Sequence, residues 1–375
     1  MSAEASNAAD TIALEVVPST EAVAVGELWR ALEDEVGCIG FACSWAWTET
    51  WLAHFGDIVP HEFAVGHVDG RPCGIALLVL ETQRRGGVVR VRRLHFGTAG
   101  LPRRDDVYVC SNRLLAAPAH QRGFAAAVLR AVMLDGRWDE IVLDRFAPDA
   151  VAPLVDACPE LELRPERCPV VDLTAANETD GDVVSTLRST PRHQIRRSIR
   201  GLGAVTTEVA RTPAQALDIL EELIDLHQRR WARQGEPGAF ASSRFTAFHK
   251  AVVPRLSEQD AAMLVRIRTS SRTVGCVYHL VDGTQVLAYA MGLADIRERK
   301  VKPGFVTLAA CMQACYDRDL REYNHLPEPT AYKLELSNSE RQFVSATAGR
   351  RRMKLLVISG LRKLKRRRGG LVTAV

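Results

Sequence analysis

The chain has 375 residues, of which 47% are hydrophobic and 25% charged, so it is long enough for two packed domains or one large one. It has no apolar run of the roughly 18 residues that a membrane-spanning helix needs. Its start is acidic, unlike a secretory signal, which has a basic segment and an apolar core. The sequence therefore predicts a cytoplasmic protein.

The formal net charge of +4 conceals an uneven distribution. From Arg341 onward there are eleven Lys and Arg and no acid, so the first 340 residues carry 38 basic against 45 acidic side chains. The nine cysteines are scattered and form no Cys-x-x-Cys pair. This predicts buried thiols rather than a disulfide framework or a zinc ribbon.

The first half reads as two helices followed by an antiparallel meander. Residues 1–20 are expected to be a disordered lead. Val23, Leu28, Leu32 and Val36 share one face of a helix over 20–37, and Ser44 is placed to cap the next helix. Strands then follow at 61–68, 71–82 and 88–97, a helix at about 112–134, a strand at 139–146, a helix at 149–157 and a strand at 169–173.

The second half repeats this order after a basic helical stretch. The stretch covers residues 183–203, and for its helix at 186–200 plain surface charge is slightly favoured over a cationic face toward an anionic acceptor. Further elements are expected as a helix at 213–233, strands at 262–268, 273–281 and 285–293, a helix at 305–318 and a strand at 320–326. Because strand, Asp-Gly turn, strand, helix and strand occur twice, we infer a duplicated α+β fold with two mixed or antiparallel sheets flanked by helices.

The helix expected at 305–318 is preceded by unusual charge. Arg297, Arg299, Lys300 and Lys302 stand immediately before Pro303-Gly304, although acids normally stabilise a helix N-terminus. With Gly304 as the cap, the first N–H groups would be free to bind a phosphate. A solvated loop is the alternative.

That helix has an apolar face, and the segment before it lacks two familiar nucleotide signatures. Phe305, Leu308, Ala309, Met312 and Tyr316 fall on one side, which predicts packing on the preceding strands. The Gly-Lys-Ser/Thr ending of a Walker loop and the three spaced glycines of a dinucleotide fingerprint are missing. Nucleotide hydrolysis and hydride transfer are therefore disfavoured.

Several strings resemble the CelD-like acetyltransferases, a family of the GNAT superfamily associated with cellulose biosynthesis and related to the Fem peptidyltransferases. They are Leu226-His227-x-x-Arg230-Trp231, Pro303-Gly304, Tyr332-Lys333 and the Trp-rich segment 44–56. The resemblance covers roughly residues 25–345. One departure is Asn324-His325-Leu326-Pro327-Glu328-Pro329 before Tyr332, where relatives usually carry an Asp and a Gly-Asp pair.

The resemblance implies a double GNAT fold with acyl-CoA held by the second half. It implies an N-terminal lobe at 21–175, an acyl-CoA-binding lobe at 176–345 and a basic tail at 346–375. The implied acyl-CoA-binding residues are Met291, Lys300, Lys302, Gly304, Phe305 and Val306. An N–H near Met291 would stabilise the oxyanion of the thioester carbonyl.

Three residues are candidates for catalysis. His325 could act as general acid or base, with a structural histidine as the alternative. The resemblance raises Tyr332, which could protonate the leaving thiolate, and Lys333, which could bind an anion, above the alternative of an ordinary strand end. Glu335, two residues along the same expected strand face, could pair with Lys333 or act as a base.

Other residues point to the acceptor or to no special role. Arg230, Trp231 and Tyr289 are candidates for acceptor binding, against a Trp that anchors a helix end. Cys311 and Cys315 have the spacing of metal ligands but no partner pair that would complete a tetrahedral set. We therefore expect no metal.

The basic tail predicts a partner of negative charge. Its leucines and cations suit an amphipathic helix on an anionic membrane surface, and the absence of aromatic residues disfavours specific nucleic-acid recognition. A solvated tail is the alternative.

The sequence thus predicts an acyltransferase that uses acyl-CoA and acts on an amine or hydroxyl of a small-molecule or glycan acceptor that contains sugar or is linked to the cell envelope. It would be cytoplasmic or peripheral at the inner face of the membrane. Fem-like transfer from aminoacyl-tRNA, and a non-catalytic protein that holds an assembly at the membrane, are the alternatives.

Overall fold

The computed structural model describes residues 12–37, 39–85, 89–298, 300–328 and 330–349. Its helices are α1 (Ala22–Val36), α2 (Trp45–Phe55), α3 (Gln121–Leu134), α4 (Pro148–Ala157), α5 (Ser189–Leu202), α6 (Pro213–Arg233), α7 (Ser243–Glu258), α8 (Pro303–Tyr316) and α9 (Ala331–Glu335). Its strands are β1 (Ala13–Pro18), β2 (His61–Val68), β3 (Arg71–Arg85), β4 (Val89–Phe96), β5 (Leu115–Ala116), β6 (Glu140–Phe146), β7 (Glu162–Asp172), β8 (Thr206–Val209), β9 (Ala262–Arg268), β10 (Thr273–Asp282), β11 (Gln285–Leu293), β12 (Glu322–Asn324) and β13 (Ser339–Gly349).

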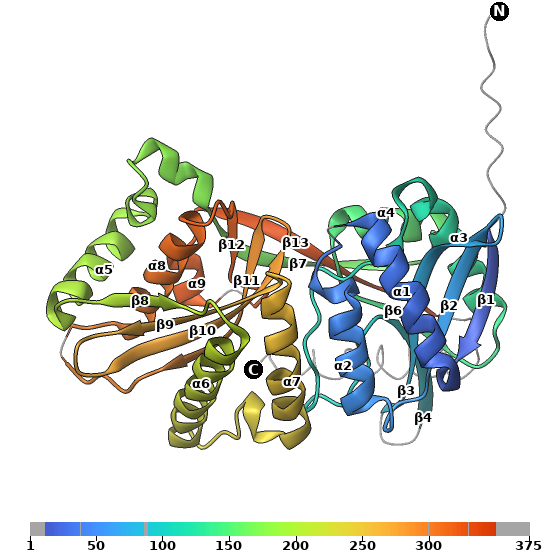
Figure 1. Cartoon of the computed structure of the whole chain (residues 1–375), viewed down its shortest axis with the longest axis horizontal. Coiled ribbons are helices and arrows are strands. Elements are labelled where there is room, and N and C mark those ends of the chain that lie inside the picture. The colour runs from blue at the N-terminus through green and yellow to red at the C-terminus, as the bar shows by residue number, and fades with distance from the viewer. Residues whose placement is uncertain (1–11, 38, 86–88, 299, 329, 350–375) are drawn as a thin grey trace, which may run out of the picture.

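All these strands belong to one mixed sheet that runs through both halves of the molecule (Figure 1). The order is β1-β2-β3-β4-β6-β13-β7-β12-β11-β10-β9-β8, with β5 paired to β3. A short parallel pairing recurs in each half, β4 with β6 and β11 with β12. The predicted α+β class is confirmed, but the two expected sheets are one continuous sheet.

The centre of the sheet is built by an exchange of strands. β7 ends the first half of the chain and pairs with β12 of the second half. β13 follows the second half and lies between β6 and β7, antiparallel to both. The strand β13 was not expected from the sequence, and residues 346–349 of the predicted tail belong to it. The rest of that tail, like residues 1–11 of the predicted lead, lies outside the described residues, and the division into lobes at residue 175 stays a prediction.

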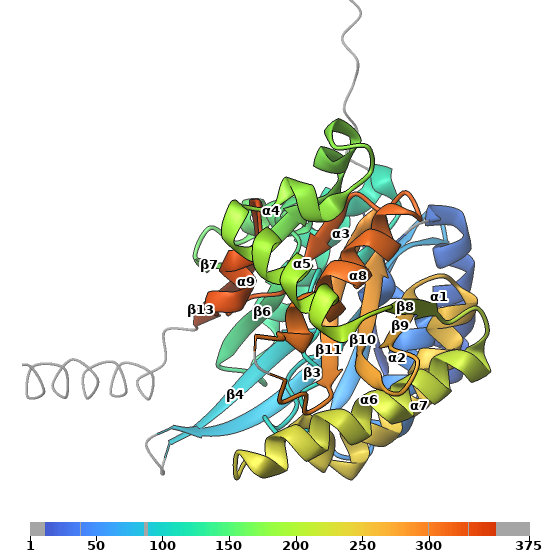
Figure 2. The ribbon, with the colours of Figure 1, turned by 90° about the vertical axis from the view of Figure 1, so that its left-hand side faces the viewer.

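The helices cover both faces of the sheet, and one of the cores that they form spans the two halves. This core, on one face, is shared by α1, α2, α6 and α7. On the other face, α3 and α4 cover the first half and α5 and α8 the second; Figure 2 shows α5 and α8 on the opposite side of the second-half strands from α6 and α7. Trp47 of α2 meets Phe248 of α7 edge to face, with ring centroids 4.9 Å apart. Figure 1 shows α2 and α7 side by side where the halves meet. This shared core fixes the two halves relative to each other.

Several local expectations change. Ser44 caps α2 as predicted and accepts a hydrogen bond from the Trp47 N–H. α1 instead buries Val25 and Trp29 beside Leu32, and Val23 is 79% exposed. β1 lies within the segment that was expected to be disordered. Its side chains are mostly exposed, and it is held in place by backbone pairing with β2. The helix expected from residue 112 begins only at Gln121, so residues 97–114 form a long connection.

Candidate active site

The site begins where two neighbouring strands of the second half separate. β11 pairs with β12 only over Gln285–Leu287 and continues alone on that side to Leu293. Its pairing with β10 shifts by one residue at Tyr289, which marks a bulge. Met291 lies in the stretch beyond the bulge. A ligand can therefore approach the backbone of β11 from the β12 side.

α8 begins at this gap, and its first turn carries no acid. Lys302, not Gly304 as expected, is the N-cap residue, since Pro303 occupies the first helical position. The N–H groups of Phe305 and Val306 both donate to the Lys302 carbonyl, at 3.1 and 3.3 Å. Within the described part of the chain, no hydrogen bond engages the Gly304 N–H. This N–H, rather than those of Phe305 and Val306, is the one open to an anion.

A cavity of about 640 Å³ opens at the N-terminus of α8. Met291, Lys302, Gly304 and Phe305, four of the residues expected to bind acyl-CoA, line it. Two other predicted contacts are absent from its lining. Val306 is 1% exposed and faces the core, and Lys300 lies in the preceding turn with φ 75°.

A second chamber of about 770 Å³ adjoins the first and reaches the other half of the molecule. The two share Arg230, Met291, Leu308 and Tyr332, so they are neighbours, and we refer to the two chambers together as the cleft. The predicted residues on the walls of this cleft are Met291, Lys302, Gly304, Phe305, Arg230, Trp231, Tyr289, His325, Tyr332 and Lys333. All of the predicted site residues except Lys300 and Val306 are thus brought together.

The first chamber carries a surplus of positive charge. Arg230, Arg233, Arg297 and Lys302 line it, with Asp295 as an acid among them. Asp295 lies 2.7 Å from Arg233 and 3.2 Å from Arg297. The Lys302 ammonium lies 4.6 Å from the centre of the Phe305 ring. Such a wall suits phosphate groups.

Tyr332 and Lys333 lie on the short helix α9, not on a strand as expected. Burial raises the pKa of Tyr332, whose ring faces both chambers. Lys333 donates to the carbonyls of Leu326 and Pro327, at 3.3 and 2.9 Å, and burial lowers its pKa. The strand-face pairing expected for Glu335 is wrong, because on a helix residues two apart do not share a face.

His325 is buried in the chamber wall, at 3% exposure. Burial lowers its pKa to about 4, while a hydrogen bond with the Leu336 backbone opposes this fall. Its Nε2 has no hydrogen-bond partner within the described chain. At neutral pH the ring is therefore uncharged, and Nε2 is an unpaired acceptor that is itself buried in the wall of the chamber. The lowered pKa makes His325 a weak base.

The residues predicted to bind the acceptor differ in how accessible they are to a ligand. Trp231, 37% exposed, lies at the rim of the chamber beside His227, with ring centroids 5.9 Å apart. Tyr289 faces the chamber, but its hydroxyl donates to the Val107 carbonyl and contacts His249 Nε2 at 3.1 Å. Trp231 is thus accessible to a ligand, whereas Tyr289 joins the halves.

Sequence reasoning missed the contribution of the first half. Asp106 and Tyr108, in the connection after β4, line the same chamber as His325 and Tyr332. Burial raises the pKa of the Asp106 carboxyl, and Arg145 and the Tyr108 N–H oppose the rise. The adjacent acids Asp105-Asp106 after two arginines were the one available signal. A carboxylate with a raised pKa in a cleft is suited to taking a proton.

Metal and membrane features were also searched in the described residues. Cys311 and Cys315 lie in the core between α8 and the sheet, where burial raises the pKa of both thiols. No cluster of three or more His, Cys, Asp or Glu with metal-binding geometry occurs in this part of the chain. None of its helices is long and apolar enough to cross a bilayer.

Solved structures share the fold at low sequence identity. FemX matches with a TM-score of 0.54 and 10% identity, over 87% of this chain and 96% of that chain. L-PGS from Bacillus licheniformis matches with a TM-score of 0.52 and 12% identity, over 90% and 95%. A conserved protein of unknown function from Bacteroides thetaiotaomicron gives 0.51 and 10%, over 86% and 97%. These likenesses establish the fold alone.

Sequence comparison is more specific for the second half. No curated protein matches the chain significantly. Residues 189–334 match the family model of the acetyltransferase (GNAT) domain. This range contains β11, α8, all of α9 except Glu335, and most of the cleft walls. The part of the chain that carries the α8 cavity is thus similar to a GNAT acetyltransferase domain.

Proposed function

We propose that the protein transfers an acyl group, acetyl in the first instance, from acyl-CoA to an amine or hydroxyl by direct attack. One observation carries this proposal. The basic cavity at the N-terminus of α8 adjoins the chamber between the halves, and the two share Arg230, Met291, Leu308 and Tyr332 beside the unpaired edge of β11. A thioester carrier and an acceptor can thus meet from opposite ends of one cleft.

The cleft residues suit distinct steps. Lys302 and the Gly304 N–H would hold the pyrophosphate of CoA, and the β11 backbone near Met291 would bind the thioester carbonyl. His325 would accept a hydrogen bond from the nucleophile, and Asp106 would take its proton. Tyr332, whose ring lies between the chambers, would protonate the departing thiolate.

The acceptor is proposed from the chamber and from the CelD-like resemblance. Aromatic walls at Trp231, Phe240 and Tyr108, with cations at Arg103 and Arg230, suit a glycan or another acceptor that carries negative charge. We therefore propose a sugar-containing or envelope-linked acceptor in exopolysaccharide metabolism. The protein would work in the cytoplasm or at the inner face of the membrane.

Acetyl-CoA binding tests the proposal. A ligand at a hundredfold excess over its Kd should stabilise the fold by about 2.7 kcal/mol, measured as a rise in the thermal unfolding midpoint. Lys302→Glu and Gly304→Trp should abolish this rise. Lys250→Glu makes the same charge change on α7, where Lys250 pairs with Glu221, and should keep it. An unchanged response in both cleft variants would refute the proposed site.

Transfer from an aminoacyl-tRNA is the second candidate, and the basic helix α5 favours it. Arg188, Arg192, Arg196 and Arg200 lie on or next to α5, which contains no acid. The helix is tied to the start of α8, because the Lys302 N–H donates to Ser198 at 3.0 Å. A rise in the thermal unfolding midpoint with charged tRNA, but not with acetyl-CoA, would support this donor. A midpoint that neither donor changes would favour a non-catalytic role in an assembly.

A further inference from the structure

The connection between β4 and α3 brings the first half into the cleft. β4 and β6 diverge after His95, as β11 and β12 do, but here the gap is filled by protein. Asn112 bridges to Phe146, and its side-chain amide donates to the Phe96 carbonyl at 2.9 Å. Val107 and Val109 are fully buried below the surface of this connection. Asp106 and Tyr108 stand at its exposed end in the chamber.

Both walls of the chamber contain residues in the left-handed backbone region. On the first-half side these are Tyr108, with φ 46°, and Arg145 directly behind the wall, with φ 47°. On the other side they are Leu326 with φ 63° and Glu328 with φ 67°. Bulky residues in this region persist only where surrounding contacts hold them, and such strain concentrates at functional sites.

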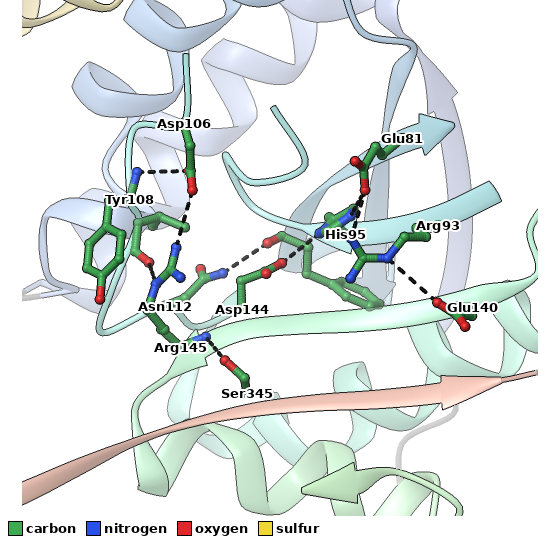
Figure 3. Close-up of polar contacts among 12 residues, drawn as sticks. Glu81, Arg93, His95, Asp106, Tyr108, Asn112, Glu140, Asp144, Arg145 and Ser345 are labelled. Atoms are coloured by element: carbon green, nitrogen blue, oxygen red, sulfur yellow. Dashed lines mark hydrogen bonds and ion pairs between the residues drawn. The ribbon is translucent and has the colours of Figure 1, made fainter. Parts of the chain in front are cut away.

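Arg145, at the end of β6, makes these contacts on the first-half side (Figure 3). Its Nε donates to the Val109 carbonyl at 2.8 Å, and its guanidinium lies 4.0 Å from the centre of the Tyr108 ring. Its terminal nitrogen lies 4.0 Å from the Asp106 carboxylate. The backbone N–H of Arg145 donates to Ser345 of β13 at 3.1 Å. One side chain thus touches both residues that the first half presents to the chamber.

A charge cluster around the buried His95 lies behind Arg145. The next residue, Asp144, lies 2.7 Å from His95 Nδ1, and Glu81 lies 3.2 Å from His95 Nε2. Arg93 pairs with Glu81 at 2.8 Å. Figure 3 shows Asp144 between His95, Glu81 and Arg93 on one side and Arg145 with Asp106 on the other. The charged groups that act on Asp106 from the first half are Arg145, Asp144 and His95. Arg103, on the same connection as Asp106, also lines the chamber, and the charged groups across the chamber are Arg230, Glu328 and Lys333.

We propose that Arg145 is a positioning residue of the acyl transfer: it holds Asp106 and Tyr108 in the chamber, so that the first half supplies the proton-accepting side of the active site. This rests on the proposed function. In the step, the nitrogen or oxygen of the acceptor bonds to the thioester carbonyl carbon and the carbon–sulfur bond breaks. The proton of the nucleophile goes to the Asp106 carboxylate, and the CoA thiolate leaves and is protonated by Tyr332.

Direct titration of Asp106 in the full-length chain tests the assignment without any substrate. Carbon-13 NMR of labelled aspartate carboxyls, assigned with Asp106→Asn, should place the pKa of Asp106 above its ordinary value. Arg145→Gln removes a neighbouring cation and should raise this pKa further, whereas Arg145→Lys should restore part of the difference. Arg164→Gln, at an exposed arginine of β7, should change nothing. If the pKa of Asp106 is the same in Arg145→Gln as in the wild type, the proposal is overturned.

Acyl-CoA experiments separate this proposal from the proposed function. Arg145→Gln should leave the thermal shift with acetyl-CoA unchanged. With glucosamine as the probe acceptor, it should lower kcat at least tenfold at constant KM for acetyl-CoA and shift the acid limb of the pH profile upward. If wild-type protein is not protected by acetyl-CoA, the proposed function fails while the titration still decides the role of Arg145. Lost protection in Arg145→Gln alone would show a general structural role and overturn the inference.

Discussion

His95 is a buried side chain whose charged form is stabilised by the residues around it. It is 2% exposed and lies between the carboxylates of Asp144 and Glu81. Burial favours the neutral ring, but the two carboxylates outweigh burial and raise the pKa of His95. The charged form is therefore bound more tightly in the folded state than in the unfolded state, so it stabilises the fold.

This stabilisation should depend on pH. It is fully present below the unfolded pKa of about 6.5 and is lost as the pH rises through the higher folded pKa. We expect His95→Asn to lower the free energy of unfolding by about 1–3 kcal/mol at low pH, where the two partly buried carboxylates lose their donor, and by less at alkaline pH. Urea unfolding at about pH 5.5 and pH 9 measures the difference. His193→Asn on exposed α5 is the control, and an equal loss at both pH values would contradict the prediction.

At the scale of elements, α2 is the piece that locks the halves together. Trp47 is fully buried, and its ring meets Phe41 and Phe248 with centroids 5.0 and 4.9 Å apart. Its indole N–H donates to Thr98 at 2.7 Å. The same side chain thus joins α2, α7 and the connection after β4.

Removing this side chain should be costly. Trp47→Ala is expected to lower the free energy of unfolding by about 3–5 kcal/mol, because it leaves a cavity that rigid elements on three sides cannot close. Denaturant unfolding followed by circular dichroism measures the loss. Val23→Ala on exposed α1 should change it by less than about 0.5 kcal/mol. Similar losses in the two variants would argue against this account of the core.

Some elements could be predicted from the sequence because their signals are local. The cap at Ser44 and the apolar face of α8 depend on residues within two turns, and both are confirmed. α9 is only five residues long and carries no helical period that distinguishes it from a strand end. β13 offers few apolar residues, and its order comes from pairing with β6 and β7, which lie far away in the sequence. Pairing of that kind leaves little trace in one segment.

At the scale of the whole molecule, the two sides of the cleft were predictable to different degrees. Positive charge before α8 is unusual because it opposes the helix dipole. This local feature of the sequence predicted an anion site at the position of the first chamber. Asp106 reaches the second chamber only because the halves are packed against each other. The hydrogen bonds from Lys333 to two backbone carbonyls likewise depend on the path of the chain at Leu326–Pro327. No spacing in the sequence reports either contact.

The exchange of strands predicts that the halves depend on each other. A chain that ends at Asn338 lacks β13, so β6 and β7 lose a common partner and leave two long unpaired edges in the middle of the sheet. We expect this chain to aggregate or to lose cooperative unfolding, measured by size-exclusion chromatography and thermal denaturation. A chain that ends at Gly349 keeps all of β13 and is the control. A monomeric, cooperatively unfolding product of the shorter chain would contradict the prediction.

The position of β13 also sets the order of events during synthesis. β6 leaves the ribosome long before β13 does. The edge of β6 that pairs with β13 therefore stays unpaired while about two hundred further residues are made. Completion of the sheet is therefore postponed until residues 339–349 emerge. Until then nascent chains present an exposed strand to one another, so chaperone capture of that edge is expected to determine the yield of active protein.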